Sequence, residues 1–491
     1  MDTTSQAAPG ATAATLGRYP AASHRYDELL DGSGAIRPHW TALMEHLGTG
    51  TEAADRALAL THRLIADGGI TYIAPADPRG AARPWALDPL PLVIPAAEWR
   101  QIERGVAQRA RLLEALLADL YGPQRLLEDR LVPAELAYGH PNFLWPAHGI
   151  EVAGGTRLRL YAADLARAPD GRWWLLADRT QTPSGVGYAL VNREISAQVL
   201  PAPLRDLQVR ALGEFVQALQ HTLLGGAAGA GPAVVLSSGP YNETYFEHAY
   251  LARQLGMALC QGANLTVRHD SLYRRSAQGL ERVQAILRRV DDDYCDPLEL
   301  RSDSALGVAG LLNVVRAGRV ALANALGTGV LESRGWLGFY PALADRLLGE
   351  PLELPSVATW WCGEAPALQY VLAHLEELII AGVFPNQHFA PVAGCTLNPA
   401  ERAGLSARLR ARPYAYVAQE HLALSQVPVL HGAAGARLGP GALSIRVYAL
   451  AQGDGHLVMP GGLAWVAEDT ATDAVGTQGG GASKDIWVLG A

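Results

Sequence analysis

The segment WWLLADRTQTPSGVG, residues 173–187, constrains the fold more than any other part of the chain. It opens with four large apolar residues, a pattern typical of a short buried strand. Six polar residues then crowd into the seven positions from Asp178 to Ser184, and Pro183 and Gly185 close the segment as a turn. A rigid strand that carries polar side chains to its end is a common support for a functional site. We therefore expect this strand end to form part of the site.

A second strand is predicted directly upstream, at residues 157–164, and the turn APDG at 168–171 links the two strands. The resulting hairpin would bring Asp164 near Asp178. Two facing carboxylates on neighbouring strands are typical of a divalent-cation site, because Mg²⁺ prefers oxygen ligands. We expect the two carboxylates to converge on one metal ion. The alternative is that both cap turns or pair with arginine.

The bulk composition limits the class of protein. The chain has 491 residues, of which 49% are hydrophobic, so it can bury a large core in two to four packed subdomains. Its formal net charge of −8 disfavours a general nucleic-acid binder. The first residues lack the basic and apolar regions of a signal peptide, no long apolar run predicts a membrane span, and the four cysteines form no CxxC pair. These features predict a cytoplasmic protein without membrane or nucleic-acid partners.

Strand and helix patterns alternate along the chain, which predicts an α/β (α+β) fold. The clearest helices are expected at 98–120, 203–224, 243–256, 305–317, 365–376 and 399–412, and the clearest strands at 233–238, 283–287, 358–362, 377–384 and 414–420.

A second polar cluster follows the predicted strand at 283–287. Arg288 and Arg289 come directly after the strand, and the aspartates at 291–293 follow them. Ligands of α/β proteins bind at the carboxyl ends of strands. We therefore expect the cluster to open onto the same cleft as Gln181 and Ser184; the alternative is a run of solvated surface charges.

Two glycine-containing segments add candidates for anion binding. Gly327 and Gly329 flank a threonine in a predicted turn. Glycines allow the backbone of such a turn to come close to a phosphate, although the same turns also occur as plain connections. Near the other end, three glycines precede Lys484 and form a predicted flexible loop tipped by a cation; a flexible tail is the alternative.

Seven blocks of sequence together resemble the circularly permuted ATP-grasp type 2 family, which is related to the ligase half of glutathionylspermidine synthase. They extend over nearly the whole chain from about residue 90. The blocks are LLADLYGPQRLL (116–127), YAADLARAPDGRWWLLADRTQTPSG (161–185), YNETYFEHAYLARQLG (241–256), LRRVDDDYCDPL (287–298), ANALGTGV (323–330), YVAQEHLALS (416–425) and QGGGASKDIWVL (478–489).

The resemblance implies a circularly permuted ATP-grasp fold with a Rossmann-like subdomain before it. It implies ATP and Mg²⁺ as cofactors, activation of a carboxylate as an acyl phosphate, and attack by an amine. The substrates would be small-molecule or peptide carboxylates and amines, and a protein partner is left open. The implied division is a loose tail at 1–22, a helical N-terminal region at 23–90, the first part of the core with the acidic hairpin at 91–230, the Rossmann-like subdomain at 231–305, and the lid with the rest of the core at 306–491.

The resemblance also implies roles for individual residues. Asp164 and Asp178 would bind metal, and Arg289, Arg446 and Lys484 would lie around the phosphate or the substrate carboxylate. The nucleotide would be bound by Gln419, Glu420, Arg334, Gly327, Gly329 and Ser184.

The chain departs from the family pattern at several positions, among them the expected glycine-rich loop, replaced by PNQHFAPVAG, and Arg334, where many members carry lysine. Active-looking members read LEDN where this chain reads LADR, so Ala177 and Arg179 replace two metal ligands. Ala381 stands where such members carry a lysine that contacts ATP phosphates. Two hypotheses follow: an ATP-dependent carboxylate–amine ligase, with a degenerate nucleotide site, or a non-catalytic relative that binds a ligand or partner. We expect weak ATP binding and little ADP release.

Overall fold

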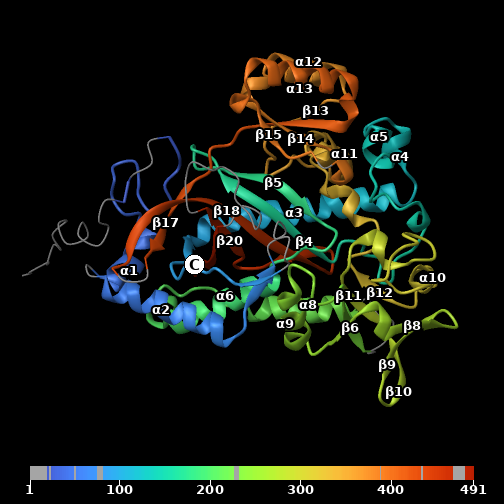
Figure 1. Ribbon diagram of the computed structural model, residues 1–491, viewed down its shortest axis with the longest axis horizontal. Coiled ribbons are helices and arrows are strands. Elements are labelled where there is room, and N and C mark those ends of the chain that lie inside the picture. Colours follow the sequence, from blue (N-terminus) through green and yellow to red (C-terminus); the bar gives the residue numbers. More distant parts are fainter. Residues whose placement is uncertain are drawn as a thin grey trace, which may run out of the picture.

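A computed structural model of the chain describes residues 19–20, 24–48, 51–73, 81–225, 232–387, 389–432, 435–467 and 481–490. The predicted tail therefore lies outside the described residues, apart from Tyr19 and Pro20. Figure 1 shows a wide central body with a small α/β unit, formed by β13–β16, α12 and α13, standing above it.

The body is built on an eight-stranded sheet whose longest strand is β18 (Arg437–Gln452). Its six-strand path runs in the order β3-β21-β20-β18-β4-β5, and the remaining two strands, β17 and β19, pair with β18. The other strands are β3 (Leu92–Ile94), β4 (Leu160–Arg167), β5 (Trp173–Arg179), β17 (Gln426–His431), β19 (Gly455–Val458), β20 (Leu463–Ala467) and β21 (Ala482–Val488).

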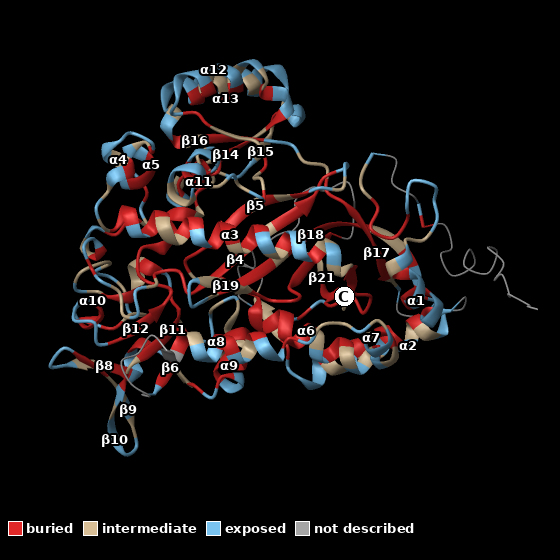
Figure 2. Cartoon of the chain, turned by 180° about the vertical axis from the view of Figure 1, so that it is seen from behind, coloured by how far each residue is buried: buried red, intermediate tan, exposed pale blue. Residues whose placement is uncertain are grey.

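Helices cover both faces of this sheet. On one face lies α3 (Ala96–Leu120), whose Leu112, Leu113, Leu116 and Leu117 share a core cluster with Tyr161 and Ala163 of β4. On the other face α6 (Val186–Val199) and α8 (Gly213–Gly225) share a second cluster with Leu160 and Ala162. Successive residues of a strand point to opposite faces, so β4 is buried from both sides, as Figure 2 shows.

A parallel sheet lies beside the main sheet. Its order is β12-β11-β6-β7, and α9 (Tyr245–Gln254) packs on β6 and β7. Asn324, directly after β12, joins the two sheets because its side-chain amide bonds the backbone of both Leu160 and Thr180. The strands are β6 (Ala233–Ser237), β7 (Ala258–Cys260), β11 (Ala285–Arg289) and β12 (Ala321–Ala323), and a three-stranded sheet of β8 (Leu265–Arg268), β9 (Ser271–Ser276) and β10 (Gly279–Val283) projects from this region.

The upper unit, which we call the lid, is an antiparallel sheet in the order β13-β16-β14-β15 with two helices on one side. Asn398 and Glu401 form a capping box at the start of α13, in which each side chain accepts the backbone N–H of the other residue. The lid elements are β13 (Thr359–Trp361), α12 (Ala365–Ala373), β14 (Leu378–Gly382), β15 (Val392–Ala393), α13 (Pro399–Ala411) and β16 (Tyr416–Glu420).

The remaining elements lie mostly in the N-terminal half of the chain. They are α1 (Pro38–Leu47), α2 (Glu52–Asp67), β1 (Thr71–Ile73), β2 (Ala82–Pro84), α4 (Arg125–Glu128), α5 (Ala134–Tyr138), α7 (Pro201–Asp206), α10 (Leu311–Arg316) and α11 (Tyr340–Leu348), with nine 3₁₀ turns among the described residues: Trp145–Ala147, Gly262–Asn264, Asp292–Cys295, Thr328–Glu332, Arg334–Trp336, Leu375–Glu377, Pro385–Gln387, Gly394–Thr396 and Pro413–Ala415.

The mixed α/β class and the β4–β5 hairpin are confirmed, whereas two predicted helices differ in length. The segment at 203–224 is split into α7 and α8, and the apolar stretch at 305–317 is helical only over α10. Gly310 begins that helix in the left-handed conformation, at φ +82°, so the chain upstream follows another path. In the described residues, each helix is too short or too polar to cross a bilayer.

Candidate functional site

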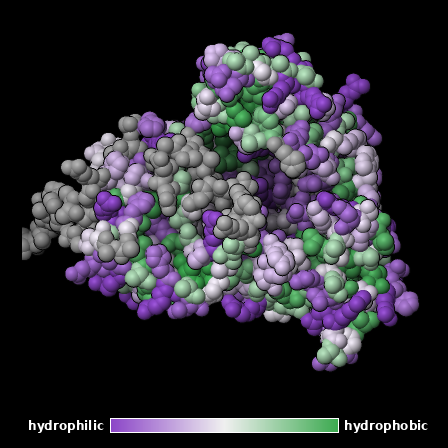
Figure 3. Space-filling model, in the orientation of Figure 1, coloured by the Kyte–Doolittle hydropathy of each residue, from purple (hydrophilic) through white to green (hydrophobic). Residues whose placement is uncertain are grey.

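A cleft of about 900 Å³ lies between the lid and the body. Figure 3 shows a hollow beneath the lid with hydrophilic residues inside it. The segment that follows β5 enters the cleft, as the sequence predicts for Gln181 and Ser184. The wall also includes Asn142, Asp164, Ala177, Arg179, Asp291, Asp293, Glu332, Arg334, Ile379, Gln419, Glu420, Arg446 and Trp465.

An ion-pair cluster occupies the floor of the cleft. Arg446 lies directly opposite Asp164 in the sheet and binds both of its carboxylate oxygens, at 2.6 and 3.0 Å. Arg179 donates its Nε to the same carboxylate at 2.9 Å. Burial alone would raise the pKa of Asp164, but Arg446 and Arg179 outweigh it and lower that pKa to about 2. Asp164 is therefore a counter-ion shared by two arginines.

Arg334 supplies a third guanidinium group to the cleft wall. Among the described residues, its guanidinium group has no hydrogen-bond or ion-pair partner. Desolvation, and then repulsion from Arg179, lowers the pKa of Arg334. A partly desolvated cation without a partner is what an anionic ligand would neutralise. Arg179, Arg334, Arg446 and Asp164 together carry a formal charge of +2, and we call these four residues the arginine cluster.

The second predicted metal ligand, Asp178, points away from the cleft. Asp178 pairs with Ala163 in the sheet, and its side chain lies on the face covered by α3. There the guanidinium group of Arg109 donates hydrogen bonds to its two carboxylate oxygens at 2.7 and 2.9 Å. Tyr161 donates a third hydrogen bond at 2.6 Å. The expectation that Asp164 and Asp178 converge is wrong, because the alternative of arginine pairing holds for both carboxylates.

A β-bulge explains this outcome. The strand pairing shifts between Asp164 and Leu165, so that Leu176 is an extra residue on β5 and Asp164 lies opposite Ala177. An extra residue moves every later side chain of the strand to the other face. Without it, Asp178 would share the face of Asp164. With it, Ala177 and Arg179 face the cleft in its place.

The backbone N–H groups at the start of the cleft segment bind an internal carboxylate. Glu332 accepts hydrogen bonds from the N–H groups of Thr180 and Gln181, at 2.7 and 2.8 Å, through one oxygen. Neither the sequence spacing nor a motif indicates this contact, because Glu332 lies about 150 residues away along the chain.

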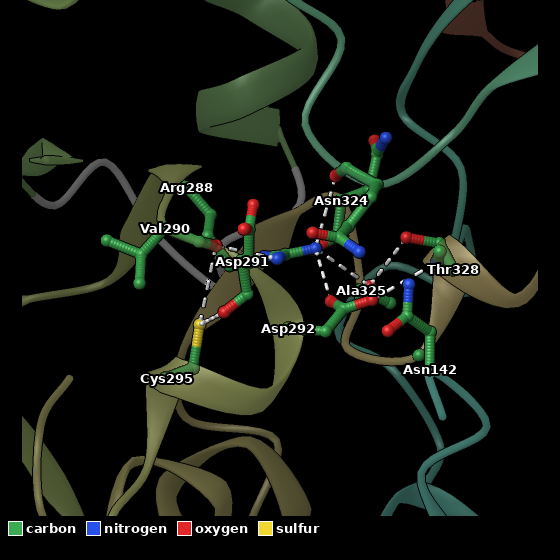
Figure 4. A network of polar contacts seen from close by, with 12 residues as sticks. Asn142, Arg288, Val290, Asp291, Asp292, Cys295, Asn324, Ala325 and Thr328 are labelled. Carbon is green, nitrogen blue, oxygen red and sulfur yellow. Dashed lines mark hydrogen bonds and ion pairs between the residues drawn. The ribbon is translucent and has the colours of Figure 1, made fainter. Parts of the chain in front are cut away.

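The glycine turn at 327–329 also holds a carboxylate instead of an open anion site. Asp292 accepts the N–H of Gly329 at 3.1 Å and is stabilised by the N–H of Gly327. Its other oxygen pairs with Arg288 at 2.7 Å, within the network drawn in Figure 4. The N–H groups of Gly327 and Gly329 are therefore occupied by Asp292, and the expected binding of phosphate by this turn is not supported.

A third carboxylate fixes the turn at the start of α6. Glu247 accepts the N–H groups of Gly185 and Gly187 through one oxygen and binds Arg289 through the other, at 2.9 Å. Arg289 also donates to the carbonyl of Pro183 at 2.7 Å. The expectation that Arg289 contacts phosphate or substrate is not met, because this side chain is buried behind the turn.

The predicted acidic cluster opens onto the cleft only in part. Asp291 and Asp293 line it together with Gln181 and Ser184, as expected. Arg288, Arg289 and Asp292 are buried instead, because they belong to the networks that fix the neighbouring turns.

Lys484 lies within β21 and away from the cleft. Its ammonium group pairs with Asp88 at 3.0 Å and donates to the carbonyl of Leu90 at 2.9 Å, and the side chain is fully buried. The expected role near phosphate is corrected accordingly: Lys484 ties β21 to the segment before β3. Most of the predicted loop before it, residues 478–480, lies outside the described residues.

The lid places Gln419 and Glu420 in the cleft wall at the end of β16, and Gln419 donates to the Thr359 hydroxyl at 3.1 Å. Ser184 stands on the opposite wall, where its backbone carbonyl accepts from Arg446 and from Tyr448. Ala381 is buried in β14, two residues beyond Ile379, which lines the cleft, so both share one face of the strand.

Comparison with known proteins agrees with this architecture. The family model of circularly permuted ATP-grasp type 2 proteins matches residues 91–467. The chain belongs to the circularly permuted ATP-grasp type 2 family. An uncharacterised protein of Mycobacterium tuberculosis is 40% identical over 476 residues, covering 94% of this chain and 53% of that protein, so the chain spans about half of its length. An uncharacterised protein of Synechocystis sp. is 36% identical over 468 residues and is covered to 97%.

A solved structure supports the fold alone. A glutathione synthetase-like effector from Globodera pallida, in its apo form, aligns with a TM-score of 0.55 at 12% identity, covering 88% of this chain and 96% of the effector. The ATP-grasp fold is thus shared across very different sequences.

ATP-grasp proteins generally bind ATP and Mg²⁺, and the residues of this cleft do not fit the metal. Both oxygens of Asp164 are held by arginines, Asp178 faces α3, and Ala177 offers a methyl group. In the part of the chain that the structure describes, no group of three or more His, Cys, Asp or Glu side chains is placed to hold a metal ion. The anionic part of a nucleotide does fit, because among the described residues the guanidinium group of Arg334 has no partner and Arg179 uses only its Nε.

Proposed function

We propose that this ATP-grasp chain binds an anionic small molecule of nucleotide size in the cleft beneath its lid, without metal-dependent ligation. The volume of about 900 Å³ is within the range of small-molecule sites. The arginine cluster supplies the positive charge, and the guanidinium group of Arg334 has no partner within the part of the chain that the structure describes. Ser184, Gln419 and Glu420 provide polar contacts on the remaining walls.

One observation carries this proposal: Asp164 is bound by Arg179 and Arg446 and is not open to a cation. Phosphoryl transfer in ATP-dependent enzymes depends on metal ions that neutralise the phosphates. A cleft floor that carries guanidinium groups in place of carboxylates favours binding of the anion over its activation.

The proposal is tested by titrating the full chain with ATP and with inorganic tripolyphosphate, and binding is followed by calorimetry and by intrinsic tryptophan fluorescence. Arg334→Met is expected to lower the affinity for both by about tenfold to a hundredfold, since a charge-assisted contact is lost. Arg63→Met, on the exposed side of α2, is the matched control. Absence of binding by either compound, or an unchanged affinity in Arg334→Met, would refute the proposal.

The second candidate is an active carboxylate–amine ligase. Asp291, Asp293 and Glu420 line the same cleft, so an amine would find carboxylate partners there. An ADP-release assay with ATP, Mg²⁺ and mixed amino acids and amines separates the two: sustained turnover supports the ligase, and binding without turnover supports the first proposal.

A further inference from the structure

We infer that the guanidinium of Arg179 takes the place of a metal ion, so that nucleotide phosphates bind in this cleft without Mg²⁺ and bind more weakly when Mg²⁺ is present. The inference rests on the proposed anion-binding function and specifies the ionic form of the ligand. In the ordinary form of such a site the nucleotide enters as its Mg²⁺ complex, and carboxylates hold the metal.

The supply of oxygen ligands on the floor of the cleft is the first line of support. In β4 and β5, both described in full, the residues that face the cleft are Asp164, Leu176, Ala177 and Arg179. Asp164 is the one carboxylate of this set, and Arg446 alone already contacts both of its oxygens. Mg²⁺ would have to displace Arg446 and Arg179 to gain a single ligand.

Several carboxylates near the floor are bound to other groups of the chain, and Asp291 and Glu420 stand on other walls of the cleft. Glu332 accepts two backbone N–H groups, Asp292 is bound to the glycine turn and Arg288, and Asp178 is bound to Arg109 behind the sheet. Asp293, on another wall, pairs with Arg301 at 3.2 Å. The described residues therefore leave no converging set of carboxylates for a metal that wants several oxygen contacts.

The charge of the arginine cluster is the second line of support. Within the arginine cluster, three guanidinium groups against one carboxylate give a formal charge of +2, and desolvation, reinforced by repulsion from Arg179, lowers the pKa of Arg334. A magnesium ion that arrives with the nucleotide lowers the negative charge of the ligand by two. This weakens its attraction to the arginine cluster, because charges interact strongly in a partly desolvated cleft.

The experiment measures the affinity of the wild-type chain for ATP in EDTA and again in excess MgCl₂, with ionic strength matched by NaCl so that screening is equal. Calorimetry and intrinsic tryptophan fluorescence report binding directly, without any turnover. We expect the dissociation constant to rise about tenfold or more on going from EDTA to MgCl₂. Tighter or exclusive binding in MgCl₂ would overturn the inference and leave the proposed function standing.

A variant pair assigns the effect to Arg179. Arg179→Asn is expected to weaken ATP binding in EDTA by about tenfold to a hundredfold and to remove the penalty of Mg²⁺. Arg172→Asn, an exposed arginine in the turn of the same hairpin, should behave as wild type. An unchanged Mg²⁺ penalty in Arg179→Asn would overturn the assignment. Failure of both ATP and tripolyphosphate to bind wild type in either buffer would refute the proposed function itself. If Arg179→Asn does not fold, the comparison of wild-type affinities in EDTA and in MgCl₂ still tests the inference.

Discussion

Asp164 and Asp178 lie on neighbouring strands of one hairpin, yet their carboxylates point to opposite faces of the sheet. Asp164 is opposite Ala177 and faces the cleft, whereas Asp178 is opposite Ala163 and faces α3. One aspartate is thus the counter-ion of Arg179 and Arg446, and the other is the counter-ion of Arg109. The two residues should respond to substitution in different ways.

Substitution of Asp178 should affect stability and leave ligand affinity unchanged. Burial alone would lower the pKa of Arg109, but Asp178 outweighs it and raises that pKa. Asp178→Ala leaves a charged Arg109 without its partner in a site that is 0% exposed, which typically costs about 3–5 kcal/mol. Urea unfolding followed by circular dichroism measures the loss, with Asp454→Ala in an exposed turn as control.

Asp178→Asn serves as the milder variant if the alanine variant does not fold. A variant that keeps wild-type stability but loses nucleotide affinity would show that the Asp178 carboxylate belongs to the cleft.

Restoring oxygen ligands should create a dependence on Mg²⁺. Ala177 and Arg179 face the cleft beside Asp164, so Ala177→Glu with Arg179→Asn places a Glu, an Asp and an Asn side chain on one face of the hairpin. The double variant should bind ATP more tightly in MgCl₂ than in EDTA, the reverse of wild type. Calorimetry in both buffers checks this, and Ala177→Gln with Arg179→Asn is the uncharged control. If Mg²⁺ does not raise the ATP affinity of the double variant, Arg446 still binds the oxygens of Asp164 and keeps them from the metal.

The glycine turn should tolerate no side chain at Gly329. A Cβ there would lie 2.3 Å from Gln181 Nε2, 2.9 Å from Asn142 Nδ2 and 3.0 Å from Asp292 Oδ2. Overpacking of this kind costs about 1–3 kcal/mol, and displacement of Gln181 and Asn142 from the cleft wall should also weaken ATP binding.

Gly404→Ala is the control for that substitution. Gly404 lies in α13 with open space around its Cα, so alanine should be neutral or stabilise the chain by up to about 1 kcal/mol. Thermal unfolding of both variants provides the measurement, and equal stability of the two would contradict the packing described for Gly329.

Glu28 should make stability fall as the pH rises toward neutrality. Burial, opposed by Arg167 and reinforced by Glu98, raises its pKa from 4.5 to about 7. The folded state therefore holds a proton that the unfolded state has lost, and stability decreases from about pH 4.5 through pH 7 by roughly 3 kcal/mol.

Glu28→Gln removes this proton equilibrium. The difference in unfolding free energy between wild type and Glu28→Gln should change between pH 5 and pH 8, whereas Glu128→Gln, exposed on α4, should show no such trend. A constant difference across that range would mean that Glu28 is ionised throughout.

Helices and strands could be predicted from the sequence more accurately than the directions in which their side chains point. The β4–β5 hairpin and the capping box of α13 follow from local signals, namely a turn motif and an Asn three residues before a Glu, and both are present. The face of the sheet to which Asp178 points depends on one extra residue, Leu176, and no residue type in that segment predicts a β-bulge.

Contacts between distant segments were equally beyond the reach of sequence patterns. Lys484 follows a glycine run that predicts an exposed loop, but its partner is Asp88, nearly 400 residues earlier in the chain. Glu332, Glu247 and Asn142 were missed for the same reason. Their roles arise only when α9, the 3₁₀ turn at Thr328–Glu332 and the loop after α5 meet the segment that follows β5.

The carboxylates of Glu332, Asp292 and Glu247 bear on how such sequences are classified. Each satisfies backbone N–H groups of a turn, and Asp292 does so in the glycine turn whose residue pattern would otherwise signal a phosphate site. These turns keep their shape through the chain's own acids, so the glycines at 185, 187, 327 and 329 have a structural role that needs no bound phosphate. A glycine turn in this chain is therefore no sign of nucleotide binding by itself, whereas the residues that face the cleft from β5 bear directly on which ligand can bind.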